Sequence, residues 1–197
     1  MRAQTTETFQ DVPDDRMDTL ARGPWYWTRT VTYWIFTVVL VFELVAGSVW
    51  NLSQIEWVHI QLNHLGYPLY FSYILGVWQI GGAAAIISPR FPRVKEWAYA
   101  GAFFEFSCAV ASHMLAGDSA EAWRVPLVYA AIVIVSWALR PADRRLSNAG
   151  LGPKTRPLSW AVPIGILLLM YVVAYLSLPA VNISMHKRAL ALGWIAR

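Results

Sequence analysis

Four side chains that could do chemistry lie in apolar stretches of this 197-residue chain. They are two acids, Glu43 and Glu105, together with Gln79 and His113. An acid in the interior of a membrane costs at least about 2.5 kcal/mol, so such groups usually face the inside of a helix bundle and find partners there. What the four residues can do therefore depends on the helices that carry them.

The composition is that of an all-α integral membrane protein. Hydrophobic residues make up 57% of the chain and charged residues only 14%, whereas soluble domains have about 25% charged residues. The apolar residues gather in long blocks, which leaves no room for a soluble catalytic domain. Cys108 is the only cysteine, so no disulfide, CxxC pair or cysteine zinc site can form within one chain.

The apolar blocks predict five membrane-spanning helices of roughly 18–24 residues. Their expected ranges are 27–50, 68–87, 96–116, 122–139 and 160–178. The polar residues 1–24 are expected to form a disordered or loosely ordered tail. They do not have the basic start and early apolar core of a cleaved signal peptide, so the first helix is expected to be retained.

Basic residues indicate the orientation, because Lys and Arg gather on the cytoplasmic side. Segment 51–66 has none, and segment 117–124 has only Arg124. This bias predicts a cytoplasmic N-terminus and an outer C-terminus. Alternatively, the fifth helix re-enters and the C-terminal tail stays cytoplasmic. The basic residues that support the orientation are Arg2, Arg16, Arg22, Arg90, Arg93, Lys95, Arg140, Arg144, Arg145, Lys154 and Arg156. They lie beside apolar blocks, which does not favour a nucleic-acid surface.

Two segments outside the spans have apolar residues. In the outer loop NLSQIEWVHIQLNHLGYP they recur at helical spacing, which is compatible with a short surface helix. A loop whose apolar residues dip into the lipid headgroups is an equal alternative. The C-terminal tail, 181–197, could form a second interfacial helix.

Depth along the helices predicts which polar groups meet. At 1.5 Å rise per residue, Glu105 and Gln79 reach about the same level, and Glu43 comes close to the level of His113. Two pairs are therefore expected, Glu105 with Gln79 and Glu43 with His113. The four could line a cavity that binds a quinone head group, relays a proton or holds a small polar ligand. They could equally be structural clasps between helices.

Small residues predict close helix packing. We assign this role to Gly76, Gly81, Gly82, Gly101 and Ser112. The histidines show no HxxxH or HExxH spacing, so no metal site is predicted. Only His113 lies within a span, which disfavours a haem held by two histidines.

Several strings together resemble the DoxX-like family of small bacterial membrane proteins. They are HLGYPLY at 64–70, LGVWQIGGAAAIISP at 75–89, KEWAYAGAFFEF at 95–106, ASHMLAGD at 111–118 and SWALRP at 136–141. The resemblance implies a four-helix membrane domain over 25–141. A basic cytoplasmic loop at 142–157 and a fifth helix at 158–180 would follow, in the bacterial cytoplasmic (inner) membrane.

The family's name comes from a small membrane subunit of an archaeal thiosulfate:quinone oxidoreductase. The resemblance implies a small membrane subunit or accessory protein of a quinone-linked redox system, whose polar seam could bind a quinone or another small ligand, with no catalysis by this chain alone. Expected partners are the lipid bilayer and other membrane subunits or a second copy. The alternative is an assembly factor for another membrane protein, with a purely structural clasp. A small transporter is a weaker third hypothesis, since the chain shows no paired broken helices.

Overall fold

A computed structural model describes residues 24–141, 144–145 and 157–195 of the chain. All regular elements in these residues are helical. They are α2 (Pro24–Leu52), α3 (Glu56–His64), α4 (Phe71–Ile87), α5 (Pro92–Leu115), α6 (Ala120–Ala138), the short 3-10 helix η3 (Pro157–Trp160), α7 (Ala161–Leu176) and α8 (Leu178–Leu192). The predicted N-terminal tail and most of the basic loop at 142–157 lie outside the described residues.

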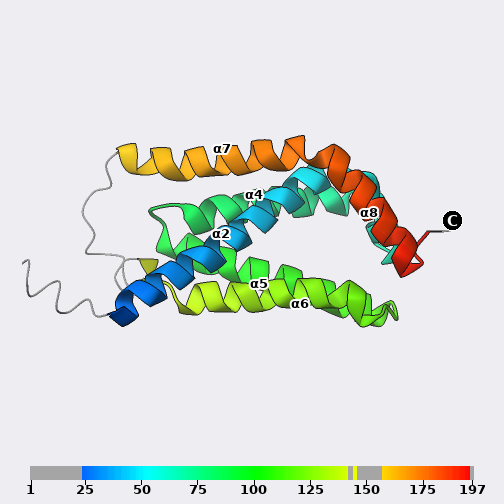
Figure 1. The fold of residues 1–197 in the computed structure, drawn as a ribbon, viewed down its shortest axis with the longest axis horizontal. Helices are drawn as coiled ribbons and strands as arrows, with labels where there is room; N and C mark the ends of the chain where they lie inside the picture. The colour runs from blue at the N-terminus through cyan, green and yellow to red at the C-terminus, as the bar shows by residue number, and fades with distance from the viewer. Residues whose placement is uncertain (1–23, 142–143, 146–156, 196–197) are drawn as a thin grey trace, which may run out of the picture.

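Helices α2, α4, α5 and α6 form an antiparallel bundle, and α7 lies along α2 on the side opposite to α6 (Figure 1). The bundle is held by apolar side chains on facing helices, among them Leu44 of α2, Ile86 of α4 and Val133 of α6. By contrast, Ala174 is the only fully buried residue of α7. The α7 helix therefore presents most of its apolar surface outward, as expected for a helix in lipid.

Within the described part of the chain, three helices are long and apolar enough to cross a membrane, over Trp25–Leu52, Ala120–Ala138 and Leu158–Leu176. The apolar α4 has 17 residues and is shorter than these. The all-helical membrane class is confirmed, whereas the exact number of five spans stays a prediction.

A chain of buried hydroxyl groups ties α2, α5 and α6 together. The Ser136 hydroxyl of α6 lies 2.8 Å from the Thr37 hydroxyl of α2 and 2.9 Å from the Tyr99 hydroxyl of α5. All three side chains are buried, and small hydroxyl residues at such contacts let helices approach closely. These bonds fix α5 against α2 and α6, which positions the polar groups of α5.

Two segments outside the predicted spans form helices. The outer loop forms the helix α3, which decides between its two predicted forms. The C-terminal tail forms α8, which begins two residues after α7 ends and turns away from it (Figure 1). Helices α3 and α8 pack against each other, and we call this end of the bundle the α8 end.

Candidate ligand-binding cleft

A cavity of about 920 Å³ is lined mainly by residues of α4 and α5. Its lining on α5 runs from Val94 to His113, so at 1.5 Å per residue it follows about 28 Å of that helix. Residues of α2, α3, α6 and α8 complete the walls. We call this cavity the cleft. All four sequence-predicted ligand residues line it, namely Glu43, Gln79, Glu105 and His113.

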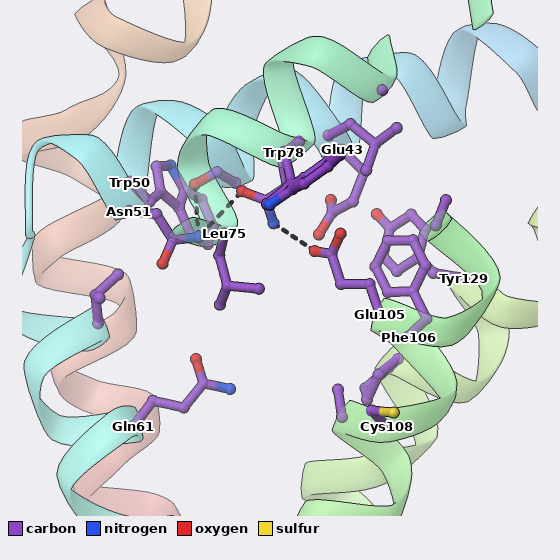
Figure 2. Close-up of a pocket in the computed structure, with 18 of the residues that line it drawn as sticks. Glu43, Trp50, Asn51, Gln61, Leu75, Trp78, Glu105, Phe106, Cys108 and Tyr129 are labelled. Atoms are coloured by element: carbon purple, nitrogen blue, oxygen red, sulfur yellow. Dashed lines mark hydrogen bonds between the residues drawn. The ribbon is translucent and has the colours of Figure 1, made fainter. Parts of the chain in front are cut away.

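The middle of the cleft contains a directed chain of hydrogen bonds (Figure 2). Asn51 Nδ2 donates to the Gly47 carbonyl oxygen at 2.9 Å and to Gln79 Oε1 at 3.1 Å. Gln79 Nε2 then donates to Glu105 Oε1 at 2.6 Å. The predicted pair of Glu105 with Gln79 is therefore present, and it bridges α4 and α5.

Glu43 extends this polar centre from α2. Its carboxyl group accepts a hydrogen bond from the Tyr129 hydroxyl of α6. Figure 2 shows the oxygens of Glu43, Glu105 and Tyr129 pointing toward one another across the cleft. Two carboxyl groups thus face one space, and the only basic side chains in the described lining, His113 and Arg188, lie toward the α8 end.

The predicted pair of Glu43 with His113 is wrong. His113 Nδ1 lies 2.8 Å from Asp118 Oδ2, and His113 Nε2 lies 3.3 Å from Gln61 Nε2. Both ring nitrogens therefore have other partners. The predicted match in depth also fails, because Glu43 lies close to Glu105, which is eight residues or about 12 Å from His113 along α5.

The glycines of α4 and α5 have two different roles. A Cβ at Gly76 would lie 2.7 Å from Leu52 Cγ, so Gly76 lies at a close approach of α2 and α4. A Cβ at Gly82 would make an ordinary contact with Leu44 at 3.9 Å. Gly81 and Gly101, predicted as packing residues, have no neighbour within 4 Å of such an atom and line the cleft instead.

Ser112, also predicted as a packing residue, makes a hydrogen bond to a neighbouring segment. Its hydroxyl lies 2.8 Å from the hydroxyl of Tyr67, whose ring stacks on Phe71 at the start of α4. Ser112 therefore links α5 to the loop before α4 at the α8 end of the cleft.

The sides of the cleft are apolar. Trp78 of α4 and the α5 residues Trp97 and Phe104 line it and are largely exposed. An opening between α4 and α5 with such a rim faces the lipid when the bundle lies in a membrane. The cleft therefore combines a lipid-accessible apolar groove with one polar centre.

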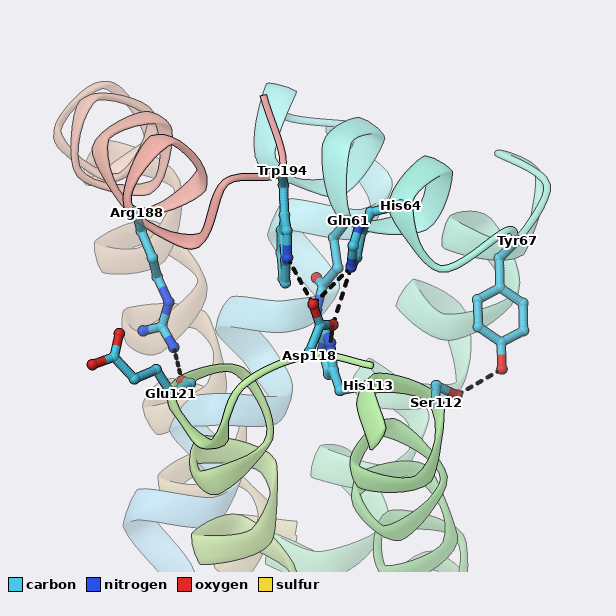
Figure 3. A network of polar contacts seen from close by, with 9 residues as sticks. All are labelled: Gln61, His64, Tyr67, Ser112, His113, Asp118, Glu121, Arg188 and Trp194. Atoms are coloured by element: carbon cyan, nitrogen blue, oxygen red, sulfur yellow. Dashed lines mark hydrogen bonds and ion pairs between the residues drawn. The ribbon is translucent and has the colours of Figure 1, made fainter. Parts of the chain in front are cut away.

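At the α8 end, Asp118 is the hub of a second polar cluster, which sequence reasoning missed (Figure 3). Its carboxylate lies 2.9 Å from His64 Nε2 and 2.8 Å from His113 Nδ1, and it accepts a hydrogen bond from Trp194 Nε1 at 3.0 Å. The spacing of His113 and Asp118 across a helix end was visible in the sequence. The contributions of His64 and Trp194 were not, because they come from distant elements.

The partners of Asp118 keep it ionised. Burial raises the pKa of its carboxyl group, but hydrogen bonds with His113, Trp194 and His64 lower it by more, so the net pKa lies below the ordinary value. A lowered folded-state pKa contributes stability above the unfolded value of about 3.8, which is lost as the pH falls through the folded value.

We expect the wild-type protein to exceed an Asp118→Asn variant in stability at pH 7 by about 1–2 kcal/mol, because hydrogen bonds to a charged group are replaced by neutral ones. The difference should shrink as the pH falls below 3.8 and disappear below the lowered folded-state pKa, where the wild-type carboxyl is also neutral. Thermal unfolding in detergent as a function of pH measures it, with the exposed Glu121→Gln as control. No difference at pH 7, or one that persists unchanged in acid, would contradict this account.

The described residues contain no group of three or more His, Cys, Asp or Glu side chains arranged to hold a metal ion. The arrangement that they do provide is an amphipathic one. It can accept a ligand with a polar head at Glu43 and Glu105 and an apolar body along α4 and α5.

Long apolar helices around a lipid-facing cleft define a multi-pass membrane protein. The model of the DoxX-like family matches residues 35–136, and the chain belongs to this family. The match contains the whole polar centre of the cleft, whereas α7 and α8 lie beyond it. Neither the curated proteins nor the solved structures include a match to the chain.

Proposed function

We propose that this protein is an accessory subunit of a membrane redox system and that it holds a quinone in the cleft. The observation that carries the proposal is the pair of carboxyl groups, Glu43 and Glu105, at the centre of a groove open to lipid. Intramembrane acids that face a cavity typically mark ligand or proton pathways.

The chemistry of a quinone fits this cleft. Its flat ring is apolar, and its carbonyl oxygens accept hydrogen bonds. A carboxyl group in its acid form donates one hydrogen bond and can still accept others. Glu105 Oε1 already accepts from Gln79, so the second oxygen of Glu105 is available to a ligand. The apolar tail would lie along the groove beside Trp78 and Phe104.

In this proposal the electrons come from a partner subunit. The apolar outer face of α7 supports this, since a second membrane subunit or a second copy of this chain could pack there. We place the protein in the bacterial cytoplasmic membrane with its N-terminus in the cytoplasm, on the basis of the family and of the basic residues.

The alternative function is that of an assembly factor for another membrane protein. The bond between Gln79 and Glu105 favours it, because this bond ties α4 to α5 and would be the structural role of both side chains. The exposed face of α7 would then bind the client protein.

Gentle purification from the native membrane, followed by mass spectrometry of lipids and proteins, tests the proposal. We expect a quinone and a redox enzyme to co-purify with the chain. Purified protein without either would overturn the proposal, and an unassembled client protein without quinone would establish the alternative. A Gly101→Leu variant is a control, because its added side chain should displace the quinone without removing a polar group.

A further inference from the structure

Helix α8 lies across one end of the cleft, where it packs against α3. Met185 and Arg188 of this helix, and Trp194 just after it, line the cleft together with residues of α2, α4 and α5. The helix is held there by apolar contacts with α3, in a cluster that includes Trp57, Leu62 and Ala189. It is thus part of the wall of the cleft.

Trp194 is the centre of this closure (Figure 3). Its ring stacks on His64 at 4.6 Å, on Trp57 at 5.2 Å and on His113 at 5.4 Å between ring centroids. Its Nε1 donates to Asp118 Oδ1 at 3.0 Å. One side chain therefore joins the C-terminal segment to α3, to α5 and to the loop before α6.

Two further contacts hold α8 in place. Arg188 Nη2 donates to the backbone carbonyl oxygen of Glu121 at 3.1 Å, which ties α8 to the start of α6. His186 Nδ1 lies 3.1 Å from Glu56 Oε1 of α3, at the surface. Helix α8 is thus attached to both α6 and α3.

A tight backbone turn at Gly193 connects the end of α8 to Trp194. Gly193 ends the helix with a φ of +74°, a left-handed conformation that glycine adopts without steric cost. The turn directs the next residue back toward the bundle. A residue with a side chain at position 193 would strain it.

We propose that α8, Gly193 and Trp194 form a cap that closes the α8 end of the cleft to water. Ligands then exchange with the surrounding lipid through the opening between α4 and α5. The cap lies outside the family match at 35–136, so it is an addition to the family's part of the chain. The inference uses the same cleft as the proposed function, but it does not require the ligand to be a quinone.

Cys108 offers a native probe of this closure. It is the only cysteine of the chain, it is exposed, and it lines the cleft. It lies five residues before His113 on α5, about 7.5 Å from the capped end. The thiolate of Cys108 is the nucleophile that attacks either reagent, and a reagent that carries a charge is confined to water. A charged reagent therefore reports an aqueous path to the cleft.

The experiment compares two thiol reagents on protein reconstituted in phosphatidylcholine nanodiscs. One is a negatively charged methanethiosulfonate, and the other is neutral N-ethylmaleimide. In a Trp194→Ala variant we expect the charged reagent to modify Cys108 about tenfold faster than in the wild-type protein. The rate with the neutral reagent should change by less than about threefold, because lipid already gives it access.

Matched variants isolate the effect of the cap. Trp25→Ala removes a largely exposed tryptophan at the opposite end of the bundle and should leave both rates unchanged. Gly193→Val keeps the tryptophan but strains the turn, so it should also accelerate the charged reagent. This variant keeps the test decisive if Trp194→Ala does not fold. Cys108→Ala gives the background.

The inference is overturned if the charged reagent modifies the wild-type protein as fast as it modifies the variants in which the cap is disturbed. Equal rates in the wild type, Trp194→Ala and Gly193→Val would show this. The two proposals fail by different results. If the protein binds no quinone but the charged reagent is still faster in the cap variants, the proposed function fails and the cap stands.

Discussion

A Gly101→Leu variant is expected to lose quinone binding by about tenfold or more, because the new side chain occupies the cleft that the ligand needs. A Cβ at this position meets no atom within 4 Å, and the position lines the cleft, so the added side chain enters the cleft. Leucine is also a better helix former than glycine by about 1 kcal/mol. The loss of binding should therefore come without loss of the fold.

The matched control is Gly165→Leu. Gly165 lies on α7, also with no neighbour within 4 Å of a Cβ, and it does not line the cleft. Quinone bound per protein is measured by solvent extraction and chromatography, and the melting temperature is measured in parallel. Equal quinone content in the two variants would show that the cleft is not the binding site.

The second large effect is expected for Glu105→Leu when it is compared with Gln79→Leu. Both changes remove the hydrogen bond of 2.6 Å between α4 and α5, which should lower stability by about 1 kcal/mol. Gln79→Leu also removes the bond from Asn51, so its loss of stability should be at least as large as that of Glu105→Leu. Only Glu105→Leu removes a carboxyl group from the cleft. We expect it to weaken quinone binding about tenfold, a loss typical of one buried polar contact, and Gln79→Leu to weaken it less than about threefold.

This comparison separates the two functions proposed for the polar centre. Binding titrations with a soluble quinone analogue and thermal unfolding supply the two measurements. If both variants lose stability and neither changes quinone affinity, Glu105 only holds the helices together, and this result supports the assembly-factor hypothesis. A selective loss of affinity in Glu105→Leu assigns the carboxyl group to the ligand.

The sequence predicted the elements well because membrane helices are encoded locally. A run of apolar residues long enough for the bilayer specifies a helix without reference to the rest of the chain. The same holds for α3, whose apolar residues recur at helical spacing. The pair of Glu105 with Gln79 was also predictable, since the rise per residue is constant and places both at one depth.

Depth alone failed for Glu43. Its predicted partner, His113, is instead held by Asp118, which follows it by five residues at the end of α5. Glu43 lies beside Glu105 instead, about 12 Å from His113 along α5, so the assumption that each residue's depth follows from its distance to the helix end was wrong for α2. The rotation of each helix about its axis, which turns Glu43 toward Tyr129, depends on the packing of all the helices.

The sequence by itself determined that this protein is an α-helical membrane protein with acids in two apolar helices. It also determined that Gln79 and Glu105 share a level, because helix geometry is local and periodic. Only the tertiary structure decided that Gly81 and Gly101 face empty space while Gly76 packs closely, since this depends on the separation of α4 from its neighbours. It also brought Trp194 to Asp118 across 76 positions of sequence, a contact that no local pattern encodes.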